Sequence, residues 1–219
     1  MTDFALARRN MVECQLRPNK VTNAALLAAV GELPRERFLP DAVRSVAYAD
    51  DDVPLGGGRS MMEPMVLARL IQALQPQADH KALVVGAGRG YGAALLARLV
   101  KIVTAVECDP ALAAAGTRTI KDLGLGTVQW VVGKLELGGP GAAPYDVVLI
   151  EGAVQQVPQA ILDQMAEGGR LCTIISGPPG ALGVAQLFVK VAGTCSGRPL
   201  FEAGTPVLPG FTPPPRFTF

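Results

Sequence analysis

The residues best suited to chemistry lie in a glycine-rich segment, Gly86-Ala87-Gly88-Arg89-Gly90-Tyr91-Gly92. Glycine lets the backbone adopt positive φ angles and pass close to a ligand. The segment follows an apolar run at 82–85 and precedes a run rich in alanine and leucine, so we expect it to join a strand to a helix. The N–H groups at the start of such a helix are free to bind a ligand. We therefore predict a binding site that contains Gly86, Ala87, Gly88 and Gly90.

A second candidate is Glu107, which ends the next apolar run and is followed by Cys108. An acidic residue about 20 positions after a glycine loop, at a strand end, is placed to accept hydrogen bonds from a ribose diol. The glycines follow G-x-G-x-G, because Tyr91 stands where the dinucleotide pattern G-x-G-x-x-G has its last glycine. That looser spacing is typical of S-adenosylmethionine-dependent methyltransferases. These residues predict a nucleoside-containing cofactor, and the alternative is a turn whose glycines serve only the packing of strand against helix.

Short β-branched runs alternate with helix-sized segments from residue 82 onwards, which is typical of parallel βαβ units with helices on both faces of a sheet. The last two runs have no helical pattern between them and can form an antiparallel edge. We expect a doubly wound, Rossmann-like α/β fold with a mostly parallel seven-stranded sheet, and an extended proline-rich tail at 213–215. The expected strands are 82–85, 102–106, 128–132, 146–150, 170–175, 186–191 and 200–206, and the expected helices are 21–35, 65–74, 93–99, 110–123 and 159–165.

The first third of the chain has a different residue pattern. Helical spacing on either side flanks a segment at 47–64 that is rich in Asp, Gly and Pro, which we interpret as an irregular loop. We predict an N-terminal helical portion, residues 1–75, that supplies this substrate loop, and a cofactor-binding domain, residues 76–219. Three consecutive aspartates at 50–52 are typical of a solvated turn, with a metal or a basic substrate as the alternative ligand.

Composition excludes several classes of protein. The 219 residues are 49% hydrophobic and 18% charged, which is enough for a core and excludes disorder over most of the length. A net charge of +1 lacks the basic field that nucleic-acid binding needs. No apolar run reaches the roughly 18 residues of a membrane span, and charges interrupt the N-terminus where a signal peptide is apolar. The four cysteines lack metal or redox spacing. We therefore expect a soluble cytoplasmic protein with no metal and no nucleic-acid or membrane partner.

Several segments together resemble one enzyme family. Residues 33–40, LPRERFLP, are similar to the V-P-R-E-x-F-V-P segment of the protein-L-isoaspartate O-methyltransferases. Residues 83–91, LVVGAGRGY, resemble that family's L-E-I-G-T-G-S-G-Y. On these segments the chain is identified as a divergent member of the family over most of its length. Further similar segments lie at 11–17, 47–48, 54–56, 145–158 and 168–171.

The resemblance implies methyl transfer from S-adenosylmethionine to the carboxylate of L-isoaspartyl and D-aspartyl residues in damaged proteins or peptides. That nucleophile is already ionised near neutral pH, so catalysis depends mostly on alignment and on exclusion of water. By the same resemblance, the cofactor is expected to contact the glycine loop, Glu107, Cys108, Lys134 and Leu135.

The chain departs from the family pattern at polar positions. The family loop G-x-T-I-S-Q-P corresponds to Gly58–Pro64, in which Ser60 keeps a hydroxyl and Met62 stands at the family's active-site serine. Methionine has no hydroxyl to donate to a carboxylate. Val84 replaces an acidic residue of the first strand, and Lys134 replaces the aspartate that the family places near the adenine. The candidate catalytic positions are therefore Ser60 and Met62.

Arg59, in the same loop, is a candidate to pair with a substrate carboxylate, with an exposed surface arginine as the alternative. Three functions stay open on these residues. In the first, Ser60 or backbone N–H groups replace the missing serine and the chain is a methyltransferase. In the second, the chain is a non-catalytic or altered-substrate module that binds a nucleoside. In the third, it is a different nucleotide-using enzyme.

Overall fold

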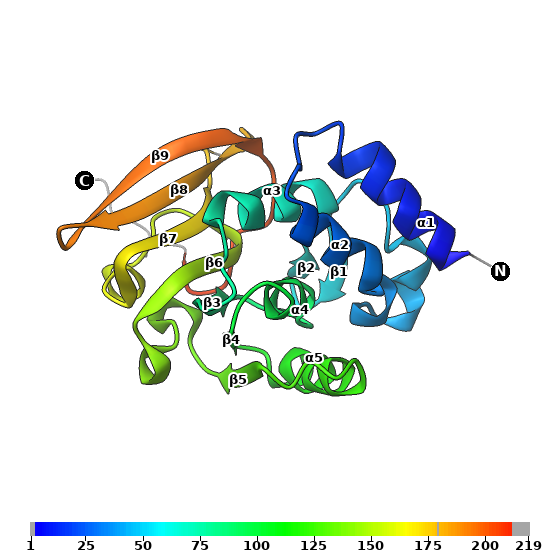
Figure 1. The fold of residues 1–219 in the computed structure, drawn as a ribbon, viewed down its shortest axis with the longest axis horizontal. Helices are drawn as coiled ribbons and strands as arrows, with labels where there is room; N and C mark the ends of the chain where they lie inside the picture. Colours follow the sequence, from blue (N-terminus) through cyan, green and yellow to red (C-terminus); the bar gives the residue numbers. More distant parts are fainter. Residues whose placement is uncertain (1–2, 179, 212–219) are drawn as a thin grey trace, which may run out of the picture.

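A seven-stranded sheet forms the centre of the molecule, with strand order β5-β4-β3-β6-β7-β8-β9 (Figure 1). The neighbours from β5 to β7 pair in parallel, and β8 and β9 add an antiparallel edge. The predicted seven-stranded, mostly parallel sheet is confirmed. The strands are β3 (Lys81–Val85), β4 (Ile102–Glu107), β5 (Val128–Val132), β6 (Tyr145–Val154), β7 (Met165–Ile175), β8 (Gly183–Val191) and β9 (Thr194–Ala203).

The coordinates are a computed structural model that describes residues 3–178 and 180–211. The predicted tail at 213–215 lies outside the described residues. Within those ranges, no helix is both long enough and apolar enough to cross a membrane.

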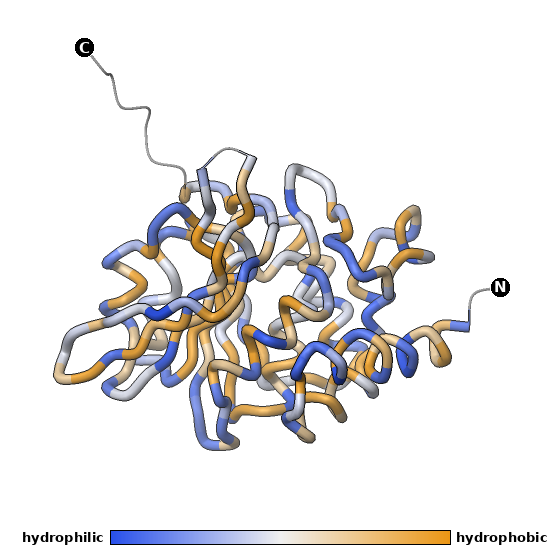
Figure 2. The backbone as a smooth tube through the Cα atoms, turned by 90° about the horizontal axis from the view of Figure 1, so that it is seen from above, coloured by the Kyte–Doolittle hydropathy of each residue, from blue (hydrophilic) through white to orange (hydrophobic). Residues whose placement is uncertain are grey.

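The two faces of the sheet bury alternate residues of the same strands. Val84 and Leu149 belong to a core on one face, and Val85 and Ile150 belong to a core on the other. Nearly continuous apolar strands are therefore needed, as parallel sheets covered on both faces require. Figure 2 shows the hydrophobic strands gathered in the middle of the molecule, with hydrophilic turns around them.

The helices divide between the two faces. Residues of α3 (Pro64–Leu74), α4 (Tyr91–Ala97) and α5 (Pro110–Asp122) contribute to the first core, and those of α6 (Gln159–Leu162) contribute to the second. The predicted helix at 159–165 is shorter in the structure, because the chain has already entered β7 at Met165.

The N-terminal part packs on the first face and shares its core. It consists of α1, a π-helical continuation, α2 and two short 3-10 helices. Residues from Met11 to Leu74 and residues of the sheet form one buried cluster, so this part does not build a separate core. The division at residue 75 stays a prediction. The bounds are α1 Phe4–Asn10, η1 Met11–Leu16, α2 Ala24–Glu32, η2 Arg35–Phe38 and η3 Asp41–Val46.

The segment predicted as an irregular loop contains a small hairpin, which corrects that prediction. Strands β1 (Val53–Gly56) and β2 (Arg59–Met61) pair antiparallel. Gly57 and Gly58 have φ of 59° and 73°, which lets the chain reverse tightly between them. Apolar residues at alternate positions of β1 are buried, so the hairpin packs one side against the rest of the fold.

Helix α5 approaches Trp130 of β5 through a glycine, which gives a test of the packing. A Cβ at Gly116 would lie 2.5 Å from the Trp130 ring and 2.8 Å from the Arg89 carbonyl oxygen. We expect Gly116→Ala to lower the free energy of unfolding by about 1–3 kcal/mol through overpacking. Gly31 is a helical glycine of α2 with nothing within 4 Å of its added Cβ, so Gly31→Ala should instead stabilise by roughly 0.5–1 kcal/mol. Urea unfolding measures both, and equal effects of the two substitutions would contradict this packing.

Candidate functional site

The glycine loop leaves β3 at its carboxyl end and turns directly into α4. Gly86, Gly88 and Gly90 have φ of 76°, 56° and 89°, in the left-handed region that side chains other than glycine rarely adopt. The N–H groups of Gly86 and Ala87 both donate to the Val106 carbonyl, at 3.0 and 3.1 Å, which ties the loop to β4. The loop therefore lies over the carboxyl ends of two neighbouring strands.

Glu107, the last residue of β4, is completely buried beside this loop. Its Oε2 accepts a hydrogen bond of 2.6 Å from the Gly88 N–H. Its Oε1 accepts hydrogen bonds from the N–H groups of Cys108 and Asp109, at 2.8 and 3.1 Å. The structure thus brings Gly88, Glu107 and Cys108 together, and three backbone N–H groups donate to the carboxylate.

Arg59 enters the same place from β2. Its Nη1 donates to Glu107 Oε1 and its Nη2 donates to the Gly86 carbonyl, both at 2.8 Å. The exposed fractions of the two paired side chains are 3% for Arg59 and 0% for Glu107. Arg59 is therefore not an exposed surface arginine, and its guanidinium is engaged by a carboxylate of the protein itself. The expectation of a substrate carboxylate as its partner did not foresee this buried ion pair.

The segment Thr205–Leu208 crosses the carboxyl end of β6 and covers the loop from the other side. The Ala153 N–H donates to the Pro206 carbonyl at 3.0 Å, and the Leu208 N–H donates to the Ala153 carbonyl at 2.9 Å. A Cβ on Gly86 would lie 2.9 Å from the nearest Leu208 carbon, and one on Gly152 would lie 2.5 Å from it. The Leu208 side chain therefore occupies the space that these glycines leave.

The covering segment is also tied to the acidic triplet. The Thr205 hydroxyl donates to Asp52 Oδ2 at 2.6 Å, and the Glu63 N–H donates to Asp52 Oδ1 at 2.7 Å. Burial raises the pKa of Asp52 above its ordinary range. Asp52 is thus half-buried and doubly hydrogen-bonded, whereas Asp50 and Asp51 are exposed, as the predicted solvated turn requires.

The remaining space is small. A cavity of about 10 Å³, room for roughly one water molecule, lies between Arg59, Ser60 and Glu151 on one side and the Thr205–Leu208 segment on the other. On the other side of the loop, a Cβ at Gly88 would meet Leu55 at 2.9 Å. In this conformation the residues do not fit a nucleoside, because the cradle is filled and the Glu107 carboxylate is already paired.

The other predicted site residues lie around this centre. The Gly133 N–H donates to the Glu107 carbonyl at 3.1 Å, so the following Lys134 and Leu135 stand next to the strand end. Lys134 is exposed and Leu135 is buried. Met62 is 1% exposed and belongs to the first core, whereas Ser60 is half-buried and lines the cavity. Their roles in binding or catalysis stay predictions.

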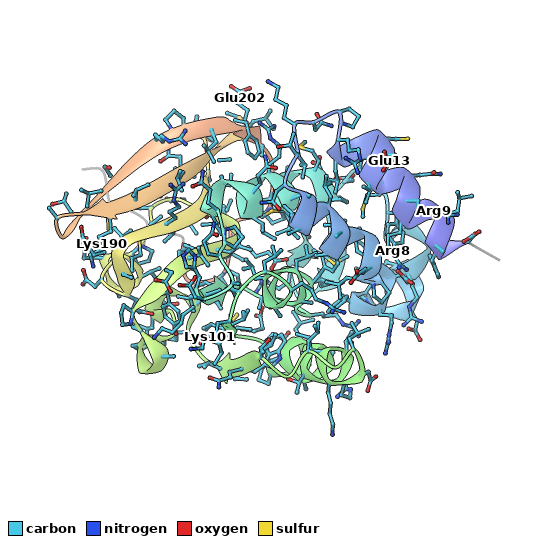
Figure 3. All side chains as sticks on the ribbon, in the orientation of Figure 1. Arg8, Arg9, Glu13, Lys101, Lys190 and Glu202 are labelled. Atoms are coloured by element: carbon cyan, nitrogen blue, oxygen red, sulfur yellow. The ribbon has the colours of Figure 1, made fainter. Side chains whose placement is uncertain are left out.

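Charged side chains elsewhere lie mostly at the outside of the molecule. Figure 3 shows Arg9 and Glu13 on the N-terminal helices and Lys190 and Glu202 on the β8–β9 hairpin, all at the margin of the view. Among the described residues only a few charged side chains are buried, and Arg59 and Glu107 are two of them, with Arg35, Glu36 and Glu151. Burial of Arg59 and Glu107 fits the rule that charged residues are rarely buried unless paired.

Sequence reasoning missed Glu151, which directly follows the apolar run 147–150 of β6. It is 5% exposed, and its Oε2 has no hydrogen-bond partner among the described residues. Burial raises its pKa to about 8, against the opposing effect of the Arg35 and Arg59 charges. A charged residue at the carboxyl end of a buried parallel strand is a usable signal, since ligand sites form at that edge.

Comparisons with known proteins agree on one family. The sequence model described as Protein-L-isoaspartate(D-aspartate) O-methyltransferase matches residues 7–199. The protein-L-isoaspartate O-methyltransferase of Methylorubrum populi is 42% identical over 85% of this chain and 86% of its own length. A solved protein-L-isoaspartate O-methyltransferase has a TM-score of 0.82 at 26% identity, over 93% of this chain and 66% of that chain.

A second solved structure is a Plasmodium falciparum protein in complex with S-adenosyl-L-homocysteine. Its TM-score is 0.75 at 17% identity, over 95% of this chain and 99% of that chain. At this identity the likeness shows the fold alone.

Glu151 gives a prediction about stability and pH. Because its pKa of about 8 lies above the ordinary 4.5, the folded chain keeps a proton that the unfolded chain releases between these two values. The contribution of Glu151 to the free energy of unfolding is therefore fully present below about pH 4.5. It is lost as the pH rises through 8, by about 1.4 kcal/mol for each unit by which the folded-state pKa is raised. We expect Glu151→Gln to remove this loss. The free energy of unfolding of the variant should therefore increase relative to that of the wild type as the pH rises from 5 to 9.

Thermal unfolding of both proteins across that range measures the difference. Glu13→Gln is the matched control, because the side chain of Glu13 is 61% exposed, and its curve should run parallel to the wild type. A Glu151→Gln curve that also runs parallel would show that Glu151 does not titrate in this way.

Proposed function

Because the chain belongs to the protein-L-isoaspartate(D-aspartate) O-methyltransferase family, we propose that it methylates the carboxylate of L-isoaspartyl and D-aspartyl residues in damaged proteins or peptides. The family consists of S-adenosylmethionine-dependent enzymes, and the expected family and fold are both confirmed. S-adenosylmethionine supplies the methyl group when it is bound.

One observation supports this proposal best. Glu107 is oriented by the N–H groups of Gly88, Cys108 and Asp109, with the Arg59 guanidinium as a further donor. A carboxylate fixed in this way at the end of a parallel strand, next to a glycine loop, is the acceptor that a ribose needs. The arrangement keeps the cofactor-binding framework of the fold although Val84 and Lys134 replace acidic residues of the family pattern.

The chain has little acid–base chemistry to perform in such a reaction. The attacking carboxylate is already ionised at neutral pH, so no general base is required. The residues instead have to align the substrate and exclude water. Ser60 lines the cavity and offers a hydroxyl, and Leu55 and Leu208 supply apolar cover. Because Arg59 and Leu208 fill the cleft in the described conformation, the reaction requires a second, open conformation.

A non-catalytic or altered-substrate member of the family is the second candidate. The observations in its favour are the filled cleft and the position of Met62, whose side chain is buried in the core and has no hydroxyl. Such a protein would keep the fold and lose transfer to isoaspartyl carboxylates.

We further propose a cytoplasmic setting and a substrate contact through residues 58–64 of the hairpin loop. The four cysteines are free thiols in the structure, which suits a reducing compartment. The loop lies next to the glycine loop through the bond of Arg59 to Gly86.

Methyl transfer to an isoaspartyl peptide tests the proposed function, with the matching aspartyl peptide as the substrate control. We expect slow transfer by the wild type and transfer about 10–100 times faster by Met62→Ser, because one orienting hydrogen bond to a charged group contributes roughly 1.5–3 kcal/mol. Met61→Ser is the matched control, since Met61 is a neighbouring buried methionine at 3% exposure. Transfer by Met62→Ser alone would show that the natural chain has lost this reaction, and transfer by neither would favour the non-catalytic candidate.

A further inference from the structure

We propose that Arg59 is an internal latch on the cofactor site: it occupies the carboxylate intended for the ribose, and cofactor binding requires its release. The inference rests on the proposed function, which it deepens by naming what controls access to that site. It concerns Arg59, which stands at the variable position of the G-x-T-I-S-Q-P pattern.

The hydrogen-bonding capacity of Glu107 is the first argument. Oε1 accepts hydrogen bonds from Arg59 Nη1 and from the N–H groups of Cys108 and Asp109. Oε2 accepts one from the Gly88 N–H. A carboxylate oxygen has about two lone-pair sites, so three N–H donors already crowd Oε1 and a ribose hydroxyl can reach it only in place of one of them. Because the donors other than Arg59 belong to the backbone, Arg59 is the partner that can leave without unfolding the loop.

Charge is the second argument. S-adenosylmethionine carries a sulfonium, and Arg59 carries a permanent positive charge at 3% exposure. Arg59 neutralises Glu107, so the latched pair offers a cationic ligand little net attraction, whereas the released Glu107 carboxylate attracts it through an interior that screens charge weakly. Charge therefore favours binding of the ligand in the released state over the latched one.

The hairpin that carries Arg59 has three features that would allow it to move. Gly56, Gly57 and Gly58 precede it with φ of 95°, 59° and 73°. Added Cβ atoms on Gly56 and Gly58 would meet nothing within 4 Å, and one on Gly57 would meet only Asp109 Oδ2, at 3.7 Å, so the turn is sparsely packed. The pairing of β1 with β2 is also irregular between Pro54 and Gly56. A swing of this turn would withdraw Arg59 from Glu107 without disturbing the central sheet.

Binding of S-adenosylhomocysteine, measured by calorimetry on the full chain, tests the latch without any need for turnover. We expect Arg59→Gln to bind at least about tenfold more tightly than the wild type, because the ligand no longer displaces a charged hydrogen-bond partner. Arg59→Lys keeps a buried cation but loses the two nitrogens that contact Glu107 and Gly86 separately, so it should shift affinity in the same direction by less. Arg59→Lys also provides the test of the latch if Arg59→Gln does not fold.

Arg8→Gln is the matched control. Arg8 pairs with Glu36 at 3.4 Å, in a partly buried ion pair of the N-terminal part. Its loss should leave the affinity at the wild-type value.

The outcomes separate the latch from the proposed function. Equal affinities of the wild type and both Arg59 variants would overturn the latch and leave the proposed function standing. Weaker binding by the variants would also overturn it, since Arg59 would then be a ligand contact. Failure of every protein to bind at millimolar ligand would overturn the latch and contradict the proposed function as well.

Discussion

A carboxylate removed from water needs partners, and Glu107 determines how the carboxyl ends of β3 and β4 are built. Taking such a charge out of water costs several kcal/mol, even after the protein relaxes around it. Three backbone N–H groups and one guanidinium meet this requirement, at distances of 2.6–3.1 Å. The sharp path of the glycine loop follows from the same need, since the Gly88 N–H must point at the acid. The hairpin and the sheet are joined at this point because Arg59 is one of the partners.

The location of this acid follows from the order of the strands. The chain builds β3, β4 and β5 outward to one side and then returns to place β6 on the other side of β3. Neighbouring loops therefore diverge between β3 and β6, and a crevice opens at the carboxyl edge, where ligands of such sheets bind. In this protein Leu208 packs against Gly86, directly after β3, and against Gly152, near the carboxyl end of β6. The topology provides a binding crevice, and the chain's own side chains occupy it.

Much of the fold was predictable because burial leaves a mark on the sequence. The apolar β-branched runs of β3, β4 and β6 must be continuous in a sheet covered on both faces, and they were recognised within a few residues. The β1–β2 hairpin was not predicted, because its strands are short and its apolar residues are few. What holds it is contact with distant parts of the chain, which a local pattern does not contain.

The site, like the fold, has parts that the sequence predicts and parts that it does not. The proximity of the glycine loop to Glu107 follows from parallel pairing of adjacent strands, and the sequence predicted it. The partner of Arg59 did not follow, because residues 48 positions apart meet only through tertiary packing. Leu208 was missed since its role depends on a segment that returns across β6. Glu151 left a signal in the sequence, a single charge at the end of an apolar strand, that was not used.

The two hydrogen bonds of Asp52 couple parts of the cleft that are far apart in sequence. One oxygen holds Glu63, at the base of the hairpin loop, and the other holds Thr205, at the start of the covering segment. A single side chain thereby braces both walls of the cleft, the hairpin base on one side and the segment that carries Leu208 on the other.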